Sequence, residues 1–269
     1  MERRGCNGER SVPATRRVVI GTIVLAASAA LTSAPAEEPD RTLSRSIEPD
    51  PRRAAAKARA GGGEVFHMRW NLGGFLGTLA GLFVPSHGDA LLTFVPDGGE
   101  RTRIGVLISA PRREGEYFLY GADIATDGST RSAWDSYVFR GERKEREQTF
   151  EQDDVIDIAS AIQHLRRHPP RRTTRMRIWN GGKFYPVEIE PLGRTTRSYQ
   201  GNEVAVRGYS VRGVRVEGEG MFKDKLFLYF ALDDAATPLE IVGRRSLVRV
   251  RLRLVDAELP EIATVDASH

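Results

Sequence analysis

The chain has 269 residues, of which 40% are hydrophobic, 28% charged and 8% aromatic. This composition excludes a collagen, a protein that is disordered throughout and a membrane protein with many spans. Residues 1–36 hold three of the four net positive charges, so residues 37–269 are close to neutral and carry no global field that would attract nucleic acid.

The first 36 residues have the layout of a secretory signal peptide. A basic stretch precedes an uncharged apolar run over 18–31, and Ala34-Pro35-Ala36 supplies a small-residue cleavage pattern. The run of about 14 residues is shorter than the roughly 20 that a bilayer-spanning helix needs. We therefore expect cleavage near Glu37 and a periplasmic or otherwise exported protein. An uncleaved N-terminus that anchors the chain in the inner membrane is the alternative. The one cysteine, Cys6, precedes the apolar run, so it is not placed to carry a lipid.

The rest of the chain divides into three parts. Residues 37–63 are rich in Pro, Arg, Ala and Glu and lack large apolar side chains, which predicts a flexible linker whose segment 54–60 is transiently helical. Residues 64–256 consist of short runs with a period of two, which predicts a β domain. Residues 257–269 form a tail. The expected strands are 64–70, 89–95, 103–109, 116–124, 132–139, 175–179, 183–190, 203–217, 225–232, 238–242 and 246–255.

One segment, 153–168, has helical spacing instead. Asp153 is the expected N-cap, and Pro169 and Pro170 end the helix. The pattern as a whole predicts a mainly β fold, in which a single curved antiparallel sheet forms an open barrel or a sandwich with one amphipathic helix between its two halves. The apolar face of that helix is formed by Val155, Ile158, Ile162 and Leu165.

The order of several motifs resembles the bacterial exported proteins grouped as domain-of-unknown-function family 3108. The motifs are I-x-x-L-R-R-H-P over 162–169, GGKFYPVEI over 181–189, Gly220-Met221-Phe222, LFLYFALDD over 226–234, Thr237-Pro238-Leu239-Glu240-Ile241 and a closing strand over 247–255. The resemblance covers about residues 64–256 and implies an envelope protein with a strongly curved antiparallel sheet. It implies no activity and no catalytic residue. The chain departs from the family in the long apolar connection at 71–88, where a short turn is usual.

The last expected strand alternates basic and apolar residues. Side chains on one face of a strand repeat every second residue, so Arg249, Arg251 and Arg253 form a stripe. One interpretation is ion pairing across strands, for which the candidate partners are Glu188, Glu190, Glu217 and Glu219. The other is a ligand-binding site, in which the guanidinium groups hold a phosphate, carboxylate or sulfate.

The apolar connection is the second candidate. Its glycines, Gly73, Gly77 and Gly81, recur every fourth residue, a spacing that allows close helix approach. The segment is interpreted as a flap that closes one end of the core, as a lid over an apolar cavity, or as a tip that touches lipid or a partner. The residues expected to form the lid or the lipid contact are Phe75, Leu76, Leu79, Leu82 and Phe83.

No catalytic residue, metal site or cofactor is predicted. Ser86, His87 and Asp89 are too close in sequence to form a nucleophile–base–orienter line. His164 and His168 have the spacing of helical metal ligands, but two arginines lie between them. Asp233 and Asp234 are expected in a turn rather than as an acid–base pair.

These features favour a non-enzymatic envelope protein that binds an amphiphilic or anionic ligand or a partner. The expected partners are lipid or an anionic envelope polymer, with peripheral membrane contact and no nucleic acid. The alternatives are an envelope hydrolase whose site is assembled from distant strands, and a structural module tethered to the membrane.

Overall fold

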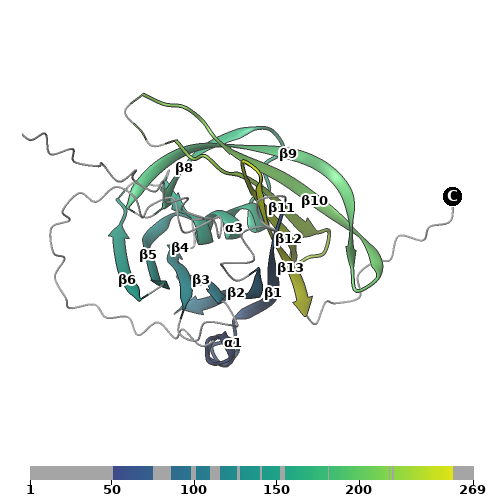
Figure 1. Cartoon of the computed structure of the whole chain (residues 1–269), viewed down its shortest axis with the longest axis horizontal. Coiled ribbons are helices and arrows are strands. Elements are labelled where there is room, and N and C mark those ends of the chain that lie inside the picture. Colours follow the sequence, from purple (N-terminus) through teal and green to yellow (C-terminus); the bar gives the residue numbers. More distant parts are fainter. Residues whose placement is uncertain are drawn as a thin grey trace, which may run out of the picture.

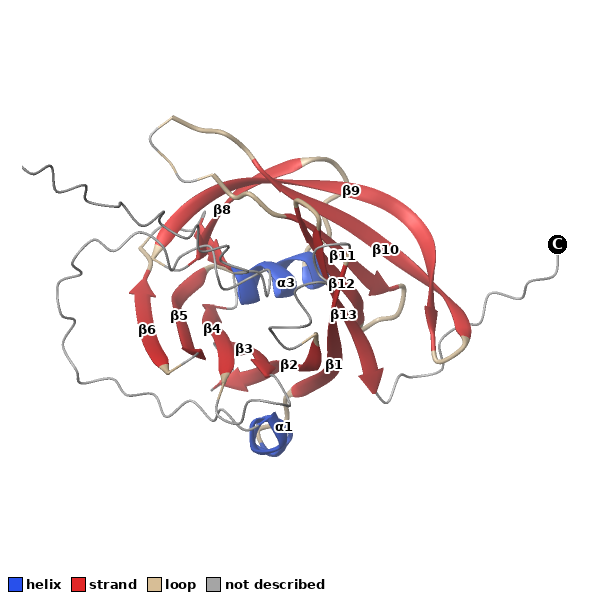
Figure 2. Ribbon diagram, viewed as in Figure 1, coloured by secondary structure: helices blue, strands red, loops and turns tan. Residues whose placement is uncertain are grey.

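The computed structural model describes residues 51–74, 86–97, 101–109, 116–125, 128–139, 141–151, 155–180, 182–217, 219 and 221–256. Thirteen strands in these ranges form one sheet, in the order β6-β5-β4-β3-β2-β1-β13-β12-β11-β10-β9-β8-β7. The sheet curls into an incomplete ring (Figures 1 and 2). The fold is therefore mainly β with a single curved sheet, as the sequence predicts. The signal-peptide and tail predictions lie outside the described residues.

The strands fall into two meanders that meet where β1 pairs with β13. The first comprises β1 (Glu64–Gly73), β2 (His87–Asp97), β3 (Arg101–Ser109), β4 (Tyr117–Ala125), β5 (Thr130–Phe139) and β6 (Glu142–Thr149). The second comprises β7 (Val155–Asp157), β8 (Thr174–Asn180), β9 (Lys183–Tyr199), β10 (Asn202–Gly213), β11 (Lys225–Ala231), β12 (Pro238–Arg245) and β13 (Val248–Asp256).

One pair of strands corrects the expectation of a wholly antiparallel sheet. β7 and β8 run parallel, and the helix α3 (Ile158–Arg167) connects them. Parallel neighbours need a crossover connection, which the helix provides. The helix is shorter than the expected 153–168, and its N-cap is Asp157 rather than Asp153. The Asp157 carboxylate accepts hydrogen bonds from the backbone amides of Ala159 and Ser160.

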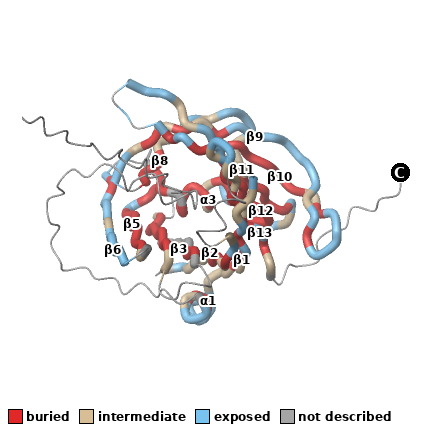
Figure 3. The backbone as a smooth tube through the Cα atoms, in the orientation of Figure 1, coloured by how far each residue is buried: buried red, intermediate tan, exposed pale blue. Residues whose placement is uncertain are grey.

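The core lies on the concave side of the sheet, around α3 (Figure 1). In β1, buried and exposed residues alternate, so one face of the strand lies in the core and the other contacts solvent, whereas β4 is buried at every interior position (Figure 3). Inward-facing Met68 and Trp70 of β1 are fully buried, as is Tyr209 of β10. Ile162 and Leu165 of α3 pack into the same cluster.

A second helix, α1 (Pro51–Ala60), lies outside the ring (Figure 1). Ala55 is buried in a cluster with Leu91, Leu107 and Leu119, which come from the outer face of β2, β3 and β4. The segment expected to be a linker therefore contains a helix packed on the sheet. Small alanine side chains permit this close approach, which the sequence pattern did not reveal.

The two ends of the sheet approach each other through aromatic packing. Phe150 follows β6, and its ring lies 6.0 Å from that of Trp179 in β8 and 6.2 Å from that of Phe184 in β9. Side chains rather than a ladder of backbone hydrogen bonds hold this seam, so the ring is not closed by strand pairing.

Candidate functional site

The predicted arginine stripe lies on the convex, outer face of β13, and a buried carboxylate serves two of its members. The Nε atoms of Arg251 and Arg253 lie 3.0 and 3.2 Å from Oε1 of Glu240, on β12. The side chain of Glu240 is only 9% exposed. Ion pairing thus occurs, but with a partner outside the four expected ones. Glu188 instead pairs with Arg175 and Arg212 of its neighbouring strands.

Glu240 also binds a third arginine, from the far end of the β9–β10 hairpin. Arg197 Nε lies 3.2 Å from the other oxygen, Oε2, and its guanidinium group stacks 3.7 Å above the ring of Tyr229. Partial burial lowers the pKa of Arg251, and the Glu240 carboxylate counteracts this effect. One carboxylate on β12 therefore holds three arginines, one from β9 and two from β13, against the outer face.

The other sequence candidates are not brought into one site. Phe75, Leu76, Leu79, Leu82 and Phe83, the expected lid or lipid contact, lie outside the described residues. His87 Nδ1 lies 3.3 Å from Ser86 Oγ, whereas Asp89 Oδ1 lies 3.1 Å from Nε2 of a different histidine, His67. A hydrolase triad requires one histidine between the serine and the aspartate, so these two separate pairs do not form one.

The described surface carries a groove that the sequence analysis missed, made of two cavities of about 340 and 320 Å³. Arg194 of β9 and Arg207 of β10, which are directly paired across the two strands, line both cavities. Each volume falls within the roughly 300–1,000 Å³ typical of small-molecule sites. We call this feature the mouth groove; the rest of its lining comes from further residues of β9, β10 and β11, the end of α3, the segment after it and the β11–β12 turn.

Part of the lining of the first cavity is apolar, and we call this part its floor. Leu165 of α3, Tyr209 of β10 and Phe230 of β11 line it. Tyr209 has no exposed surface, and its hydroxyl lies beside the guanidinium group of Arg207 without a well-aligned hydrogen bond to a described residue. Burial raises the pKa of this phenol, and the neighbouring Arg207 counteracts the rise. A buried hydroxyl without a well-aligned hydrogen bond is costly, so a group that reaches it from the groove would gain a hydrogen bond.

The rim of the groove is basic. Arg171 lines the second cavity beside Arg194 and Arg207, and none of the three forms an ion pair with a residue in the described part of the chain. Asp233 and Asp234 of the β11–β12 turn line the first cavity. Asp233 Oδ1 accepts a hydrogen bond from the backbone amide of Thr237. This hydrogen bond stabilises the turn.

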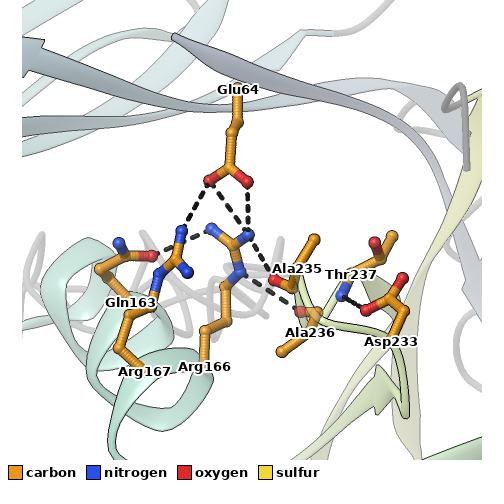
Figure 4. Close-up of polar contacts among 8 residues, drawn as sticks. All are labelled: Glu64, Gln163, Arg166, Arg167, Asp233, Ala235, Ala236 and Thr237. Atoms are coloured by element: carbon orange, nitrogen blue, oxygen red, sulfur yellow. Dashed lines mark hydrogen bonds and ion pairs between the residues drawn. The ribbon is translucent and has the colours of Figure 1, made fainter. Parts of the chain in front are cut away.

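A buried arginine holds this turn in place (Figure 4). The side chain of Arg166 has no exposed surface; Nη2 donates to the carbonyl oxygen of Ala235 at 2.8 Å, and Nε donates to that of Ala236 at 3.3 Å. Nη2 also lies 3.1 and 3.2 Å from the carboxylate oxygens of Glu64 in β1. The φ of Ala236 is 46°, in the left-handed region that an alanine rarely adopts. Arg166 therefore ties helix, first strand and groove wall together.

Two buried carboxyl groups, those of Asp135 and Asp157, lie on the concave side, away from the groove. Burial raises the pKa of Asp135 to about 6, although Arg146 lies 3.0 Å away and counteracts the rise. Burial likewise raises the pKa of Asp157, the N-cap of α3, to about 6 despite its hydrogen bonds. In the described ranges, no three His, Cys, Asp or Glu residues are grouped to hold a metal ion, and no helix is long and apolar enough to cross a membrane.

The signals of the groove were present in the sequence but scattered. Arg171, Arg194 and Arg207 are far apart along the chain and share no spacing pattern. They meet because the long β9–β10 hairpin places two of them opposite each other, and α3 ends beside it. Pro169 and Pro170, which the sequence identifies as a helix stop, also form part of the groove.

Comparison with known proteins identifies no family. No protein-family model matches the chain, and no curated protein matches it. Among solved structures, a β-barrel-like protein of the domain of unknown function DUF1849 from Brucella abortus covers 71% of this chain and 96% of its own, with 8% identity and a TM-score of 0.45. The match to the lipoprotein LppX of Mycobacterium tuberculosis spans 78% of this chain and 94% of LppX, with 10% identity and a TM-score of 0.28. The match to LprF from Mycobacterium bovis spans 78% of this chain and 93% of LprF, with 12% identity and a TM-score of 0.27. Likenesses at this level identify neither a ligand nor an activity.

Proposed function

We propose that this protein is an exported, non-enzymatic binding protein whose mouth groove holds an amphiphile with an acidic group. The observation that carries the proposal is a pair of facing arginines, Arg194 and Arg207, above an apolar floor that contains the buried hydroxyl of Tyr209. Guanidinium groups bind carboxylates and phosphates bidentately, and the floor provides the apolar contact for a chain.

The charge arrangement supports an acidic ligand rather than a neutral one. Arg194 and Arg207 are directly opposite each other, and like charges in that position repel. An anion between them removes the repulsion and adds charge-assisted hydrogen bonds, each of which contributes about 1.5–3 kcal/mol. The Asp233 and Asp234 carboxylates at the other end of the cavity favour a ligand that also carries a hydrogen-bond donor.

A matched pair of ligands tests the proposal. Oleic acid and oleyl alcohol share one chain and differ in the acidic group, so isothermal titration calorimetry with the purified protein should detect binding of the acid alone. Replacement of both arginines, Arg194→Gln with Arg207→Gln, should weaken acid binding at least tenfold because two charge-assisted contacts are lost. Arg175→Gln, which removes the charge of an arginine that is 75% exposed on the outer face, is the control and should bind as the wild type does.

The proposal is wrong if acid and alcohol bind equally, or if the double arginine variant retains full affinity with an intact fold. Equal binding would indicate a site that recognises the chain only. Tyr209→Phe provides a finer test, since it removes the buried hydroxyl and leaves the floor apolar. Acid binding should fall if the ligand reaches that hydroxyl.

We also propose that the chain is exported through cleavage near Glu37. The sequence of residues 1–36 supports this proposal, as does the resemblance of residues 64–256 to the exported family 3108. N-terminal sequencing of protein from the envelope fraction should start near Glu37. A start at Met1 on exported protein would favour the anchored alternative.

A further inference from the structure

A second surface, on the opposite face of the sheet from the mouth groove, is strongly basic. The pairing of β1, β13, β12 and β11 aligns twelve residues on this side of the sheet in three rows of four, of which Tyr229, Glu240 and Val242 are buried. Six of the twelve are basic and one is acidic, although residues 37–269 are close to neutral as a whole. The charge is therefore concentrated here. The rows are Arg69-Arg253-Glu240-Tyr229, Asn71-Arg251-Val242-Phe227 and Gly73-Arg249-Arg244-Lys225; we call them the basic outer face.

The third row is the least compensated part of this face. Arg249, Arg244 and Lys225 lie directly opposite one another on adjacent strands, where like charges destabilise a sheet. None of the three forms an ion pair with a residue that the structure describes, whereas Arg251 and Arg253 share Glu240. The row is unfavourable in isolation, and an external anion would relieve the repulsion.

An exposed leucine adjoins the same row. Leu247 lies in the β12–β13 turn and is 61% exposed, more than any other large hydrophobic residue in the described ranges. The ring of Phe227 is partly covered by Lys225 and Arg244, whose cationic groups lie 5.1 and 4.9 Å from its centre. A basic cluster beside an apolar tip is the combination that interfacial contact with an anionic membrane uses.

We propose that the basic outer face docks this protein on an anionic membrane surface, with Lys225, Arg244 and Arg249 against the lipid head groups and Leu247 at the interface. The charge complementarity of the third row favours an acidic surface, and Leu247 favours a bilayer over a soluble anion. The inference does not depend on the mouth groove, which opens on the concave side.

Vesicle co-sedimentation of the full chain tests the docking. The protein should sediment with vesicles of equimolar phosphatidylcholine and phosphatidylglycerol more strongly than with phosphatidylcholine alone, and the difference should shrink as salt is added. The apolar run at 18–31 would contribute to both kinds of vesicle, so the difference between them reports on charge. The triple variant Lys225→Gln, Arg244→Gln, Arg249→Gln should partition about a hundredfold less onto the anionic vesicles, at about fivefold per basic residue.

The matched control is the triple variant Arg171→Gln, Arg194→Gln, Arg207→Gln. It removes the same number of positive charges, but from the mouth groove. This control should keep its vesicle binding and lose oleic acid binding, whereas the outer-face variant should show the opposite pattern. Removal of three mutually repelling charges should leave the melting temperature unchanged or raise it, so a folding defect would not explain the loss. Leu247→Ser should weaken binding in a way that salt does not alter.

Equal loss of vesicle binding in the two triple variants would overturn the proposal, because net charge alone would then explain it. Equal sedimentation with the two kinds of vesicle would overturn it as well. Failure of oleic acid binding in every variant would contradict the groove proposal and leave the docking result standing.

Discussion

The guanidinium group of Arg166 combines packing with polar contacts at one point. It stacks 4.3 Å from the ring centre of Phe94 and 4.9 Å from that of Phe66, while its nitrogens bind Glu64 and two carbonyl groups of the β11–β12 turn. A charge without solvent contact is tolerated only when such partners satisfy it. The residue thereby fixes the turn that forms one wall of the groove.

We expect Arg166→Ala to lower the free energy of unfolding by about 3 kcal/mol, since it leaves two carbonyl groups and part of a carboxylate without a donor. The neighbouring Arg167 also contacts Glu64, at 3.5 Å, but is 48% exposed. Arg167→Ala should therefore cost less than about 1 kcal/mol. Urea denaturation of the two variants measures the difference, and equal costs would contradict the assigned role of Arg166.

Glu240 holds three arginines, so its removal should expose their mutual repulsion. We expect Glu240→Gln to destabilise the fold by about 1–3 kcal/mol, and added salt to recover part of the loss because salt screens the remaining positive charges. Glu188→Gln is the control, since its partners Arg175 and Arg212 are well exposed, and it should change stability little. Salt-independent unfolding of Glu240→Gln would show that repulsion is not the cause.

At the scale of single elements, β11 lies between β10 and β12 and carries different environments on its two faces. Phe230 faces the core and is 2% exposed, whereas Phe227 lies on the outer face and is half-buried. The sequence, apolar at nearly every position, predicts a strand covered on its two sides. The structure corrects this for Phe227, which is half-buried and has the cationic groups of Lys225 and Arg244 over its ring.

The two phenylalanines should therefore respond differently to truncation. Phe230→Ala should cost about 3–5 kcal/mol, because it leaves a cavity in the core. Phe227→Ala should cost less than about 2 kcal/mol, because only part of its surface leaves water. Denaturant midpoints at unchanged slope give the comparison. A larger loss of stability for Phe227→Ala than for Phe230→Ala would contradict the assignment of the core to the concave side of the sheet.

For the molecule as a whole, the buried carboxyl groups set an unusual dependence of stability on pH. Asp135 and Asp157 have pKa values of about 6 in the folded protein and about 4 when unfolded. The folded state therefore binds more protons between these values. The stability that the protonated groups confer is complete below about pH 4 and declines as the pH rises through about 6.

We accordingly expect the free energy of unfolding to be higher near about pH 5 than near about pH 7.5, by on the order of 2 kcal/mol. Asp157→Asn should flatten this dependence, since an amide can accept the capping hydrogen bonds without a charge. Urea titrations at the two pH values measure the slope. A wild-type protein that is more stable near neutrality would show that burial does not control these groups.

The sequence alone determined the class of the fold and the location of its helix. Period-two hydrophobicity is a local property, so eleven of the thirteen described strands and the amphipathic segment before Pro169 could be identified from neighbouring residues. The polar strand β6 has no such pattern, and the short strand β7 was assigned to the helix. The arginine stripe on β13 could also be predicted, because alternation fixes which residues share a face of a strand. Its ion-pair partner could not be predicted. Glu240 lies on the adjacent strand, and the pairing register of two strands depends on turns and packing.

Only the tertiary structure decided where the proposed ligand-binding site lies. Arg171, Arg194 and Arg207 lie close together because β9 pairs with β10 and α3 ends beside this hairpin. The buried hydroxyl of Tyr209 becomes a candidate binding group only because it lines the cavity. The same holds for the third row of the basic outer face, in which Arg249, Arg244 and Lys225 come from three strands. A site assembled from distant segments leaves no periodic signal in the chain, because its geometry arises from long-range pairing.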